Sequence, residues 1–168
     1  MCGILGFCGA IDIDNTQFDA ARDLMPARGP DGFGTASFPC GRGTRTLLGH
    51  RRLAIQDLSA AGRQSMDSAC GRYVTVYNGE VYNAPDLRRQ LEVKGHVFRS
   101  MSDTEVVLEG FARWGRDLVD RLHGIFAIGI WDKVEQRLFA ARDRIGGAQK
   151  NGLPLLGAFY GQLKQWAA

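Results

Sequence analysis

The sequence has few of the features that mark metal-binding, disulfide-rich or membrane proteins. Its four cysteines form no Cys-x-x-Cys pair and have no accompanying histidine cluster, so we expect no zinc site. The apolar N-terminus lacks a cationic region and is interrupted by Asp12 and Asp14, which argues against a signal peptide. No apolar stretch approaches the roughly 20 residues of a membrane span. We therefore expect a cytoplasmic protein.

The sequence also has no large excess of positive or negative charge. The formal net charge is +3, and the basic residues are dispersed along the chain, which argues against nucleic-acid binding. The length of 168 residues suits one domain with a buried core.

Hydrophobic periodicity predicts a mixture of strands and helices. Strands are expected at 2–9, 46–50, 52–57, 73–77, 125–131 and 138–141, and helices at 16–25, from 84 to about 95, and from 102 onward. In the first helix we expect an inner stripe of Phe18, Ala21, Leu24 and Met25, and Pro26 should end it.

The strand at 125–131 is apolar on both of its faces, so it should be covered on both sides. Strands joined by short turns, with helices that need a sheet to pack on, predict an α+β layered fold.

Cys2 stands directly after the initiator methionine. Removal of Met1 would place a thiol and a free α-amino group on one residue. Because an α-amino group titrates near pH 7.7–8.0, a useful fraction would be neutral and could accept the thiol proton. Position two alone is weak support, since a small apolar residue often occurs there by chance.

Further motifs accompany Cys2 in a fixed order. They are Arg28-Gly-Pro-Asp-Gly32, Gly49-His-Arg-Arg-Leu-Ala-Ile55, Asn78-Gly-Glu-Val-Tyr-Asn83 and Ser102-Asp-Thr-Glu105. Together they resemble the glutaminase domain of class II glutamine amidotransferases, and most of all glutamine-hydrolysing asparagine synthetases. The resemblance implies an Ntn-hydrolase fold, a four-layer αββα sandwich of two antiparallel sheets.

The resemblance implies catalytic roles for Cys2, Asn78 and Gly79. Cys2 matches the nucleophile, while the Asn78 side-chain amide and the Gly79 backbone N–H match the oxyanion hole. An Asn-Gly pair after a β-run is also a strong hairpin signal, and glycine lets backbone approach a ligand, so both interpretations stay open.

Substrate-binding roles are implied for a second set of residues. Arg52 matches the arginine that binds the substrate α-carboxylate, and Asp103 matches the carboxylate that receives the α-ammonium. Leu53, Ile55 and Glu80 match positions that line the glutamine pocket. For Asp103 alone, a first-turn aspartate favoured by the helix dipole is an equal alternative.

His50, His96 and His123 are interpreted as structural, because Cys2 would bring its own base.

The sequence departs from the family pattern at three places. Ala27 stands where a histidine is usual, and Ser65 where a proline is usual. After Gly146 the family pattern is lost, as in a frameshift, a fragment or a degenerate end. We therefore expect a glutaminase domain at 2–146 and a divergent tail at 147–168, with the closing strands missing or replaced and no synthetase domain.

The predicted function is the glutaminase half of an asparagine-synthetase-like amidotransferase. L-glutamine would be hydrolysed to glutamate and ammonia, and the ammonia passed to a synthetase domain or subunit. The glutaminase half needs no metal or organic cofactor, whereas ATP and magnesium belong only to a separate synthetase domain. The alternatives are a non-catalytic truncated remnant or interaction domain, and a glutaminase module serving another acceptor such as a sugar phosphate. We expect neither a nucleic-acid partner nor a membrane partner.

Overall fold

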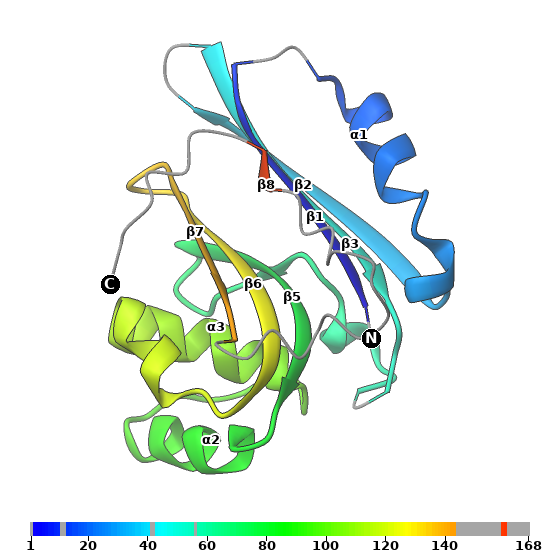
Figure 1. Ribbon diagram of the computed structural model, residues 1–168. Coiled ribbons are helices and arrows are strands. Elements are labelled where there is room, and N and C mark those ends of the chain that lie inside the picture. The colour runs from blue at the N-terminus through cyan, green and yellow to red at the C-terminus, as the bar shows by residue number, and fades with distance from the viewer. Residues whose placement is uncertain (1, 11–12, 41–42, 56, 144–158, 161–168) are drawn as a thin grey trace.

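Two β-sheets face each other and carry helices on their outer faces (Figure 1). The structure is a computed structural model that describes residues 2–10, 13–40, 43–55, 57–143 and 159–160. The backbone alone is described for the last two of these residues. Within these ranges, no helix is long and apolar enough to cross a membrane.

The first sheet has the strand order β2-β3-β1-β8. Its strands are β1 (Gly3–Gly9), β2 (Gly32–Cys40), β3 (Thr44–Arg52) and β8 (Phe159–Tyr160). The pairings of β1 with β3 and of β2 with β3 are antiparallel, whereas β8 pairs in parallel with β1 at Gly6 and Phe7. The N-terminal strand therefore has a partner on each side, and the rest of the predicted divergent tail lies outside the described residues.

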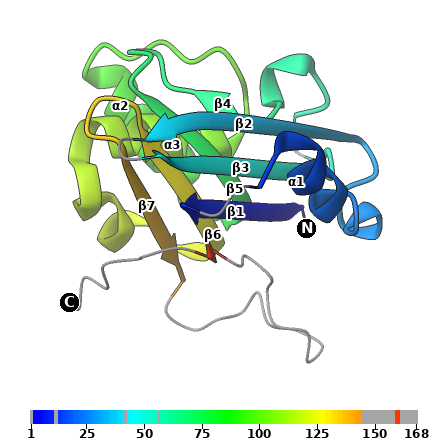
Figure 2. The ribbon, with the colours of Figure 1, turned by 90° about the horizontal axis from the view of Figure 1, so that it is seen from above.

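The second sheet has the strand order β4-β5-β6-β7, and all of its pairings are antiparallel. Its strands are β4 (Met66–Asp67), β5 (Tyr73–Val81), β6 (Gly124–Asp132) and β7 (Arg137–Arg142). Seen from above, its strands run at an angle to those of the first sheet (Figure 2).

Three helices cover the outer faces of the sheets. They are α1 (Asn15–Arg22) on the first sheet, with α2 (Ala84–Val93) and α3 (Asp103–Trp114) on the second. Short 3-10 turns are η1 (Pro26–Arg28), η3 (Ala60–Gly62) and η4 (Gly115–Arg121). Ser102 caps α3 by accepting a hydrogen bond from the Glu105 backbone N–H.

Among the described residues, three apolar clusters fill the spaces between the layers. Ile4, Leu48, Val76 and Trp131 fill the space between the sheets. Phe7, Phe18 and Leu47 pack α1 against the first sheet. A larger cluster packs α2 and α3 against the second sheet, and the alternation along β5 sends Tyr77 to this outer side and Val76 to the inner side. The predicted αββα layering is confirmed.

The predicted inner stripe of α1 is wrong except at Phe18. The helix ends at Arg22, so Leu24 lies beyond it and is 83% exposed, and Ala21 is exposed as well. Arg22 is buried instead, because its guanidinium is paired with Asp19 and Asp23.

One strand prediction near the site is also wrong, and the hairpin turn left open at Asn78 and Gly79 does not form. β3 ends at Arg52, and of the strand expected at 52–57 the described residues 53–55 and 57 are not in a strand. Asn78 and Gly79 lie inside β5, paired with Ala127 and Phe126, and not in a hairpin turn.

Candidate active site

A single pocket collects residues from both sheets and from the start of α3. Its volume is about 220 Å³, below the roughly 300–1,000 Å³ of sites for drug-sized ligands, which suits a ligand the size of an amino acid. Of the residues that the sequence predicts for the site, all except Asn78 line this pocket. They are Cys2, Arg52, Leu53, Ile55, Gly79, Glu80 and Asp103.

Cys2 directly precedes β1 and is half-buried at the pocket. Its sulfur accepts a hydrogen bond from the Leu53 backbone N–H at 3.4 Å and lies 3.7 Å from the Leu53 carbonyl oxygen. The Arg28 Nε donates to the Cys2 carbonyl oxygen at 3.1 Å. The thiol is therefore held between the start of β1 and the end of β3, and it faces the pocket.

Arg28 also contacts Cys2, although the sequence predicted no role for it beyond its place in an ordered motif. It lies in η1, where Ala27 replaces the usual histidine, and the loop still delivers its guanidinium to Cys2. The only sequence signal for this contact was an arginine in a loop rich in glycine and proline. What such an arginine contacts depends on where the loop packs in the folded protein.

Arg52 is the last residue of β3, and its guanidinium turns toward the segment that follows. Nη1 donates to the Ser59 carbonyl oxygen at 3.0 Å, and Nη2 donates to the Asp57 carbonyl oxygen. A Cβ at Gly62 would lie 2.6 Å from Nη2, so glycine at this position leaves room for the guanidinium. Two backbone carbonyls thus orient the planar group beside the pocket.

Asp103 opens α3 and is 7% exposed. Its Oδ2 accepts hydrogen bonds from the Tyr77 hydroxyl at 2.7 Å and from the Val81 backbone N–H at 3.1 Å. Burial raises the pKa of this carboxyl above its usual range, and these hydrogen bonds offset part of the effect. A cationic group entering the pocket would favour the ionised form. Tyr77 was not among the predicted site residues.

Asn78 and Gly79 occupy the part of β5 beside the pocket. Gly79 lines it, and a Cβ there would lie 2.3 Å from the Ile125 carbonyl oxygen and 2.6 Å from the Phe126 Cα. Asn78 is 1% exposed, and neither atom of its side-chain amide hydrogen-bonds to another described residue. A buried amide without a partner is costly and points to a functional requirement.

The other predicted positions lie at different depths. Leu53 contacts the Cys2 sulfur through its backbone, as described above, whereas Ile55 and Glu80 are exposed and form part of the rim. Ile55 is 71% exposed.

The histidines lie away from the pocket lining. His50 is fully buried in β3, and burial lowers its pKa to about 4, with a further contribution from Arg52. Nδ1 of His96 lies 3.7 Å from Oε2 of Glu109, and His123 contacts Asn83 through its backbone. Among the described residues, no three His, Cys, Asp or Glu side chains gather as metal ligands would.

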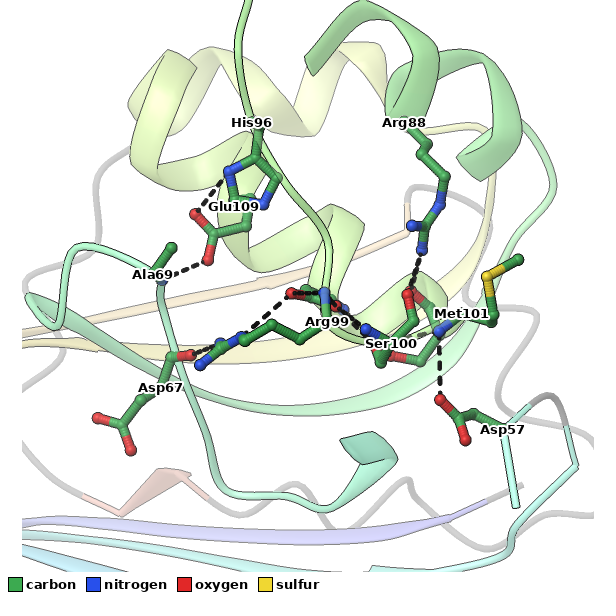
Figure 3. Close-up of polar contacts among 11 residues, drawn as sticks. Asp57, Asp67, Ala69, Arg88, His96, Arg99, Ser100, Met101 and Glu109 are labelled. Atoms are coloured by element: carbon green, nitrogen blue, oxygen red, sulfur yellow. Dashed lines mark hydrogen bonds and ion pairs between the residues drawn. The ribbon is translucent and has the colours of Figure 1, made fainter. Parts of the chain in front are cut away.

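A polar network fixes the connection between α2 and α3, which leads into Asp103 (Figure 3). The buried Glu105 carboxylate accepts hydrogen bonds from the backbone N–H groups of Arg99 and Ser100 at 3.0 and 2.7 Å. Arg99 reaches the Asp67 carbonyl oxygen, and Arg88 the Ser100 carbonyl oxygen. The segment just before Asp103 is therefore held in one conformation.

The sequence matches known proteins over most of its length. Residues 1–151 match the family described as glutamine amidotransferase domain. Asparagine synthetase [glutamine-hydrolyzing] 3 of Bacillus subtilis is 42% identical over 153 residues, which cover 87% of this chain and 24% of that protein. A putative asparagine synthetase [glutamine-hydrolyzing] of Mycobacterium tuberculosis is 37% identical over 158 residues, with the same coverage of 87% and 24%.

A solved structure is similar as well. Glutamine phosphoribosylpyrophosphate (PRPP) amidotransferase from B. subtilis, complexed with ADP and GMP, superposes with a TM-score of 0.51 at 27% sequence identity. The match covers 60% of this chain and 24% of that one. The chain spans about a quarter of the length of the curated relatives that it matches.

Proposed function

The chain belongs to the glutamine amidotransferase domain family, and from this premise we propose that it hydrolyses L-glutamine to glutamate and ammonia through a thioester on Cys2. One observation carries the proposal. The pocket that contains the Cys2 thiol is also lined by Arg52, which carries a guanidinium, and by Asp103, which carries a buried carboxylate. A pocket of this composition suits a free amino acid whose side chain reaches the thiol.

In this mechanism, Cys2 becomes the N-terminal residue once Met1 is removed. Its α-amino group takes the thiol proton, and the sulfur attacks the carbonyl carbon of the glutamine side-chain amide. The C–N bond then breaks, the amide nitrogen takes a proton and leaves as ammonia, and a γ-glutamyl thioester remains. Water hydrolyses the thioester to glutamate and regenerates the thiol.

The two ends of the substrate would be recognised separately. The planar guanidinium of Arg52 is suited to the α-carboxylate, and the Asp103 carboxylate to the α-ammonium. The raised pKa of the buried Asp103 supports this role, because a substrate ammonium would compensate the charge that burial disfavours.

The oxyanion of the tetrahedral intermediate would be held by Asn78 and Gly79. An unpartnered amide in Asn78 keeps its N–H donors available for a charge that appears only during reaction. Such preorganised donors are typically among the largest contributors to catalysis by acyl-transfer enzymes.

We propose that the ammonia passes, in the cytoplasm, to a synthetase domain or subunit. That domain or subunit would use ATP and magnesium to make asparagine. The proposal is supported by the relatives, which are asparagine synthetases [glutamine-hydrolyzing]. The solved neighbour acts with PRPP, so a phosphosugar acceptor is the second candidate.

The test is covalent labelling of Cys2 by 6-diazo-5-oxo-L-norleucine, a glutamine-like electrophile, followed by peptide mass analysis. We expect L-glutamine to protect against labelling, and glutamate to form from L-glutamine. Cys2→Ser should abolish both labelling and turnover, whereas Cys8→Ser, further along β1, should leave both unchanged. Absence of labelling on a chain that begins at Cys2 would contradict the proposal and favour a non-catalytic domain.

A further inference from the structure

Asp57 connects the two ends of the pocket through one carboxylate and one carbonyl. Its Oδ1 accepts a hydrogen bond from the Ser59 backbone N–H at 2.8 Å, and its Oδ2 accepts one from the Met101 backbone N–H at 3.2 Å. Its own carbonyl oxygen accepts from Arg52 Nη2. Asp57 itself lines the pocket and is half-buried.

These contacts connect Arg52 and Asp103, the two residues proposed to bind the ends of the substrate. Met101 lies two residues before Asp103, and Figure 3 shows the Asp57 side chain reaching its backbone from across the gap between the segments. The α2–α3 connection is already fixed on its other side, where Glu105 binds Ser100. Asp57 therefore ties the segment after β3, and with it the Arg52 guanidinium, to the residues just before α3. Further along the same segment, the Gln64 side-chain nitrogen donates to the Thr104 hydroxyl at 3.1 Å and makes a second tie, to α3 itself.

We propose that Asp57 is a positioning residue that sets the separation between Arg52 and Asp103, and so selects substrates that carry both an α-carboxylate and an α-ammonium. The proposal rests on the function proposed above. Its physical basis is preorganisation: two anchors bind one rigid ligand well only if their spacing is fixed before the ligand arrives.

Hydrogen bonds from Ser59 lower the pKa of Asp57 below its usual range, so the carboxylate stays ionised near neutral pH. Both oxygens then remain acceptors, which the two backbone donors need. Asparagine at this position could accept only through its one oxygen and would present an N–H₂ group to the other donor.

The experiment uses Asp57→Ala and Asp57→Asn in the full chain, with Asp67→Asn as a matched control. The Asp67 carboxylate contacts Lys133 at 2.5 Å on the surface and has no part in the pocket lining. Calorimetric binding of L-glutamate, which carries both end groups, is compared with binding of glutarate, which lacks the ammonium. Turnover of L-glutamine is compared with turnover of glutaramate in the same way.

We expect Asp57→Ala to weaken L-glutamate binding and to raise KM for L-glutamine, each about tenfold or more, because the two anchors lose their fixed spacing. Glutarate and glutaramate use only one anchor, so their values should change less than about threefold. Asp57→Asn should lie between wild type and Asp57→Ala, and Asp67→Asn should match wild type.

Other results would overturn the proposal. Equal losses for the one-anchor and two-anchor ligands would show that Asp57 supports only the loop, and no loss for either would show that it has no role. If the wild type bound L-glutamate but did not turn over L-glutamine, the proposed function would be wrong. The binding comparison would still test the role of Asp57. Failure of the wild type to bind L-glutamate would overturn both.

Discussion

Replacement of Asn78 by leucine should raise the stability of the protein while it removes activity. The side-chain amide is buried at 1% exposure, with no hydrogen-bond partner for its nitrogen or its oxygen among the described residues. Leucine has nearly the same shape and no polar atoms. The substitution therefore removes the cost of burying unpaired groups without opening a cavity.

The magnitude follows from two opposing effects. An unpaired buried donor or acceptor costs about 1–3 kcal/mol, and Asn78 has one of each kind of group. Imperfect fit of a near-isosteric side chain usually costs less than about 1.5 kcal/mol. We expect a net gain of at least about 0.5 kcal/mol, and for a domain of this size each 1 kcal/mol raises the midpoint of thermal unfolding by about 2–4 °C. Because Asn78 is proposed to donate to the oxyanion, its loss should lower kcat about 10²- to 10³-fold.

The assay is urea and thermal unfolding followed by tryptophan fluorescence, with Trp131 buried between the sheets as a reporter. Asn83→Leu is the matched control. The Asn83 amide donates to the Arg121 carbonyl oxygen at 2.8 Å and accepts from the His123 N–H at 2.9 Å. That variant should lose about 1–2 kcal/mol, the opposite sign. If Asn78→Leu also lost more than about 1 kcal/mol, the Asn78 amide would have to be paired in the folded protein, and the reasoning would be refuted.

Two further predictions concern the strands around the site. Gly79→Ala would place a Cβ 2.3 Å from the Ile125 carbonyl oxygen, so we expect a loss of about 3 kcal/mol or more in urea unfolding. Gly32→Ala, whose Cβ would meet nothing nearer than 3.8 Å, should lose less than about 1 kcal/mol, and equal losses would contradict the argument. Burial lowers the pKa of His50 from 6.5 to about 4, so below pH 6.5 the unfolded chain binds a proton that the folded chain does not. Stability should therefore fall by about 3 kcal/mol between pH 6.5 and pH 4, and His50→Leu should remove that part of the pH dependence; an unchanged slope would show that His50 does not cause it.

Much of the fold could be predicted because local patterns and tertiary packing agree. The alternation along β5 places Val76 between the sheets and Tyr77 under the helices, as the period of a strand requires. The third helix begins at Asp103, one residue after its predicted start, and Ser102 caps it. In α1 the pattern failed, because Arg22 is buried by Thr35 on β2 and by two neighbouring aspartates, and no periodicity of apolar residues contains that information.

The candidate site residues were predicted from ordered motifs, and the structure brings all of them except Asn78 to the lining of one pocket. Arg28, Tyr77 and Asp57 were missed. Each acts on a main-chain atom or side chain of a segment distant in sequence, namely Cys2, Asp103 and Met101. Such contacts depend on how two loops approach each other, which residue type and spacing do not encode.

The pocket draws its lining from positions 2, 52, 79 and 103, which come together only after both sheets and the start of α3 have assembled. No short fragment of the chain can contain it, and contacts of such large sequence separation form slowly and late. During refolding, the proposed glutamine-directed reactivity of Cys2 should therefore appear with the rate of global folding and not with that of any single hairpin. Labelling of Cys2 by a glutamine-like electrophile would then report when the whole fold has assembled.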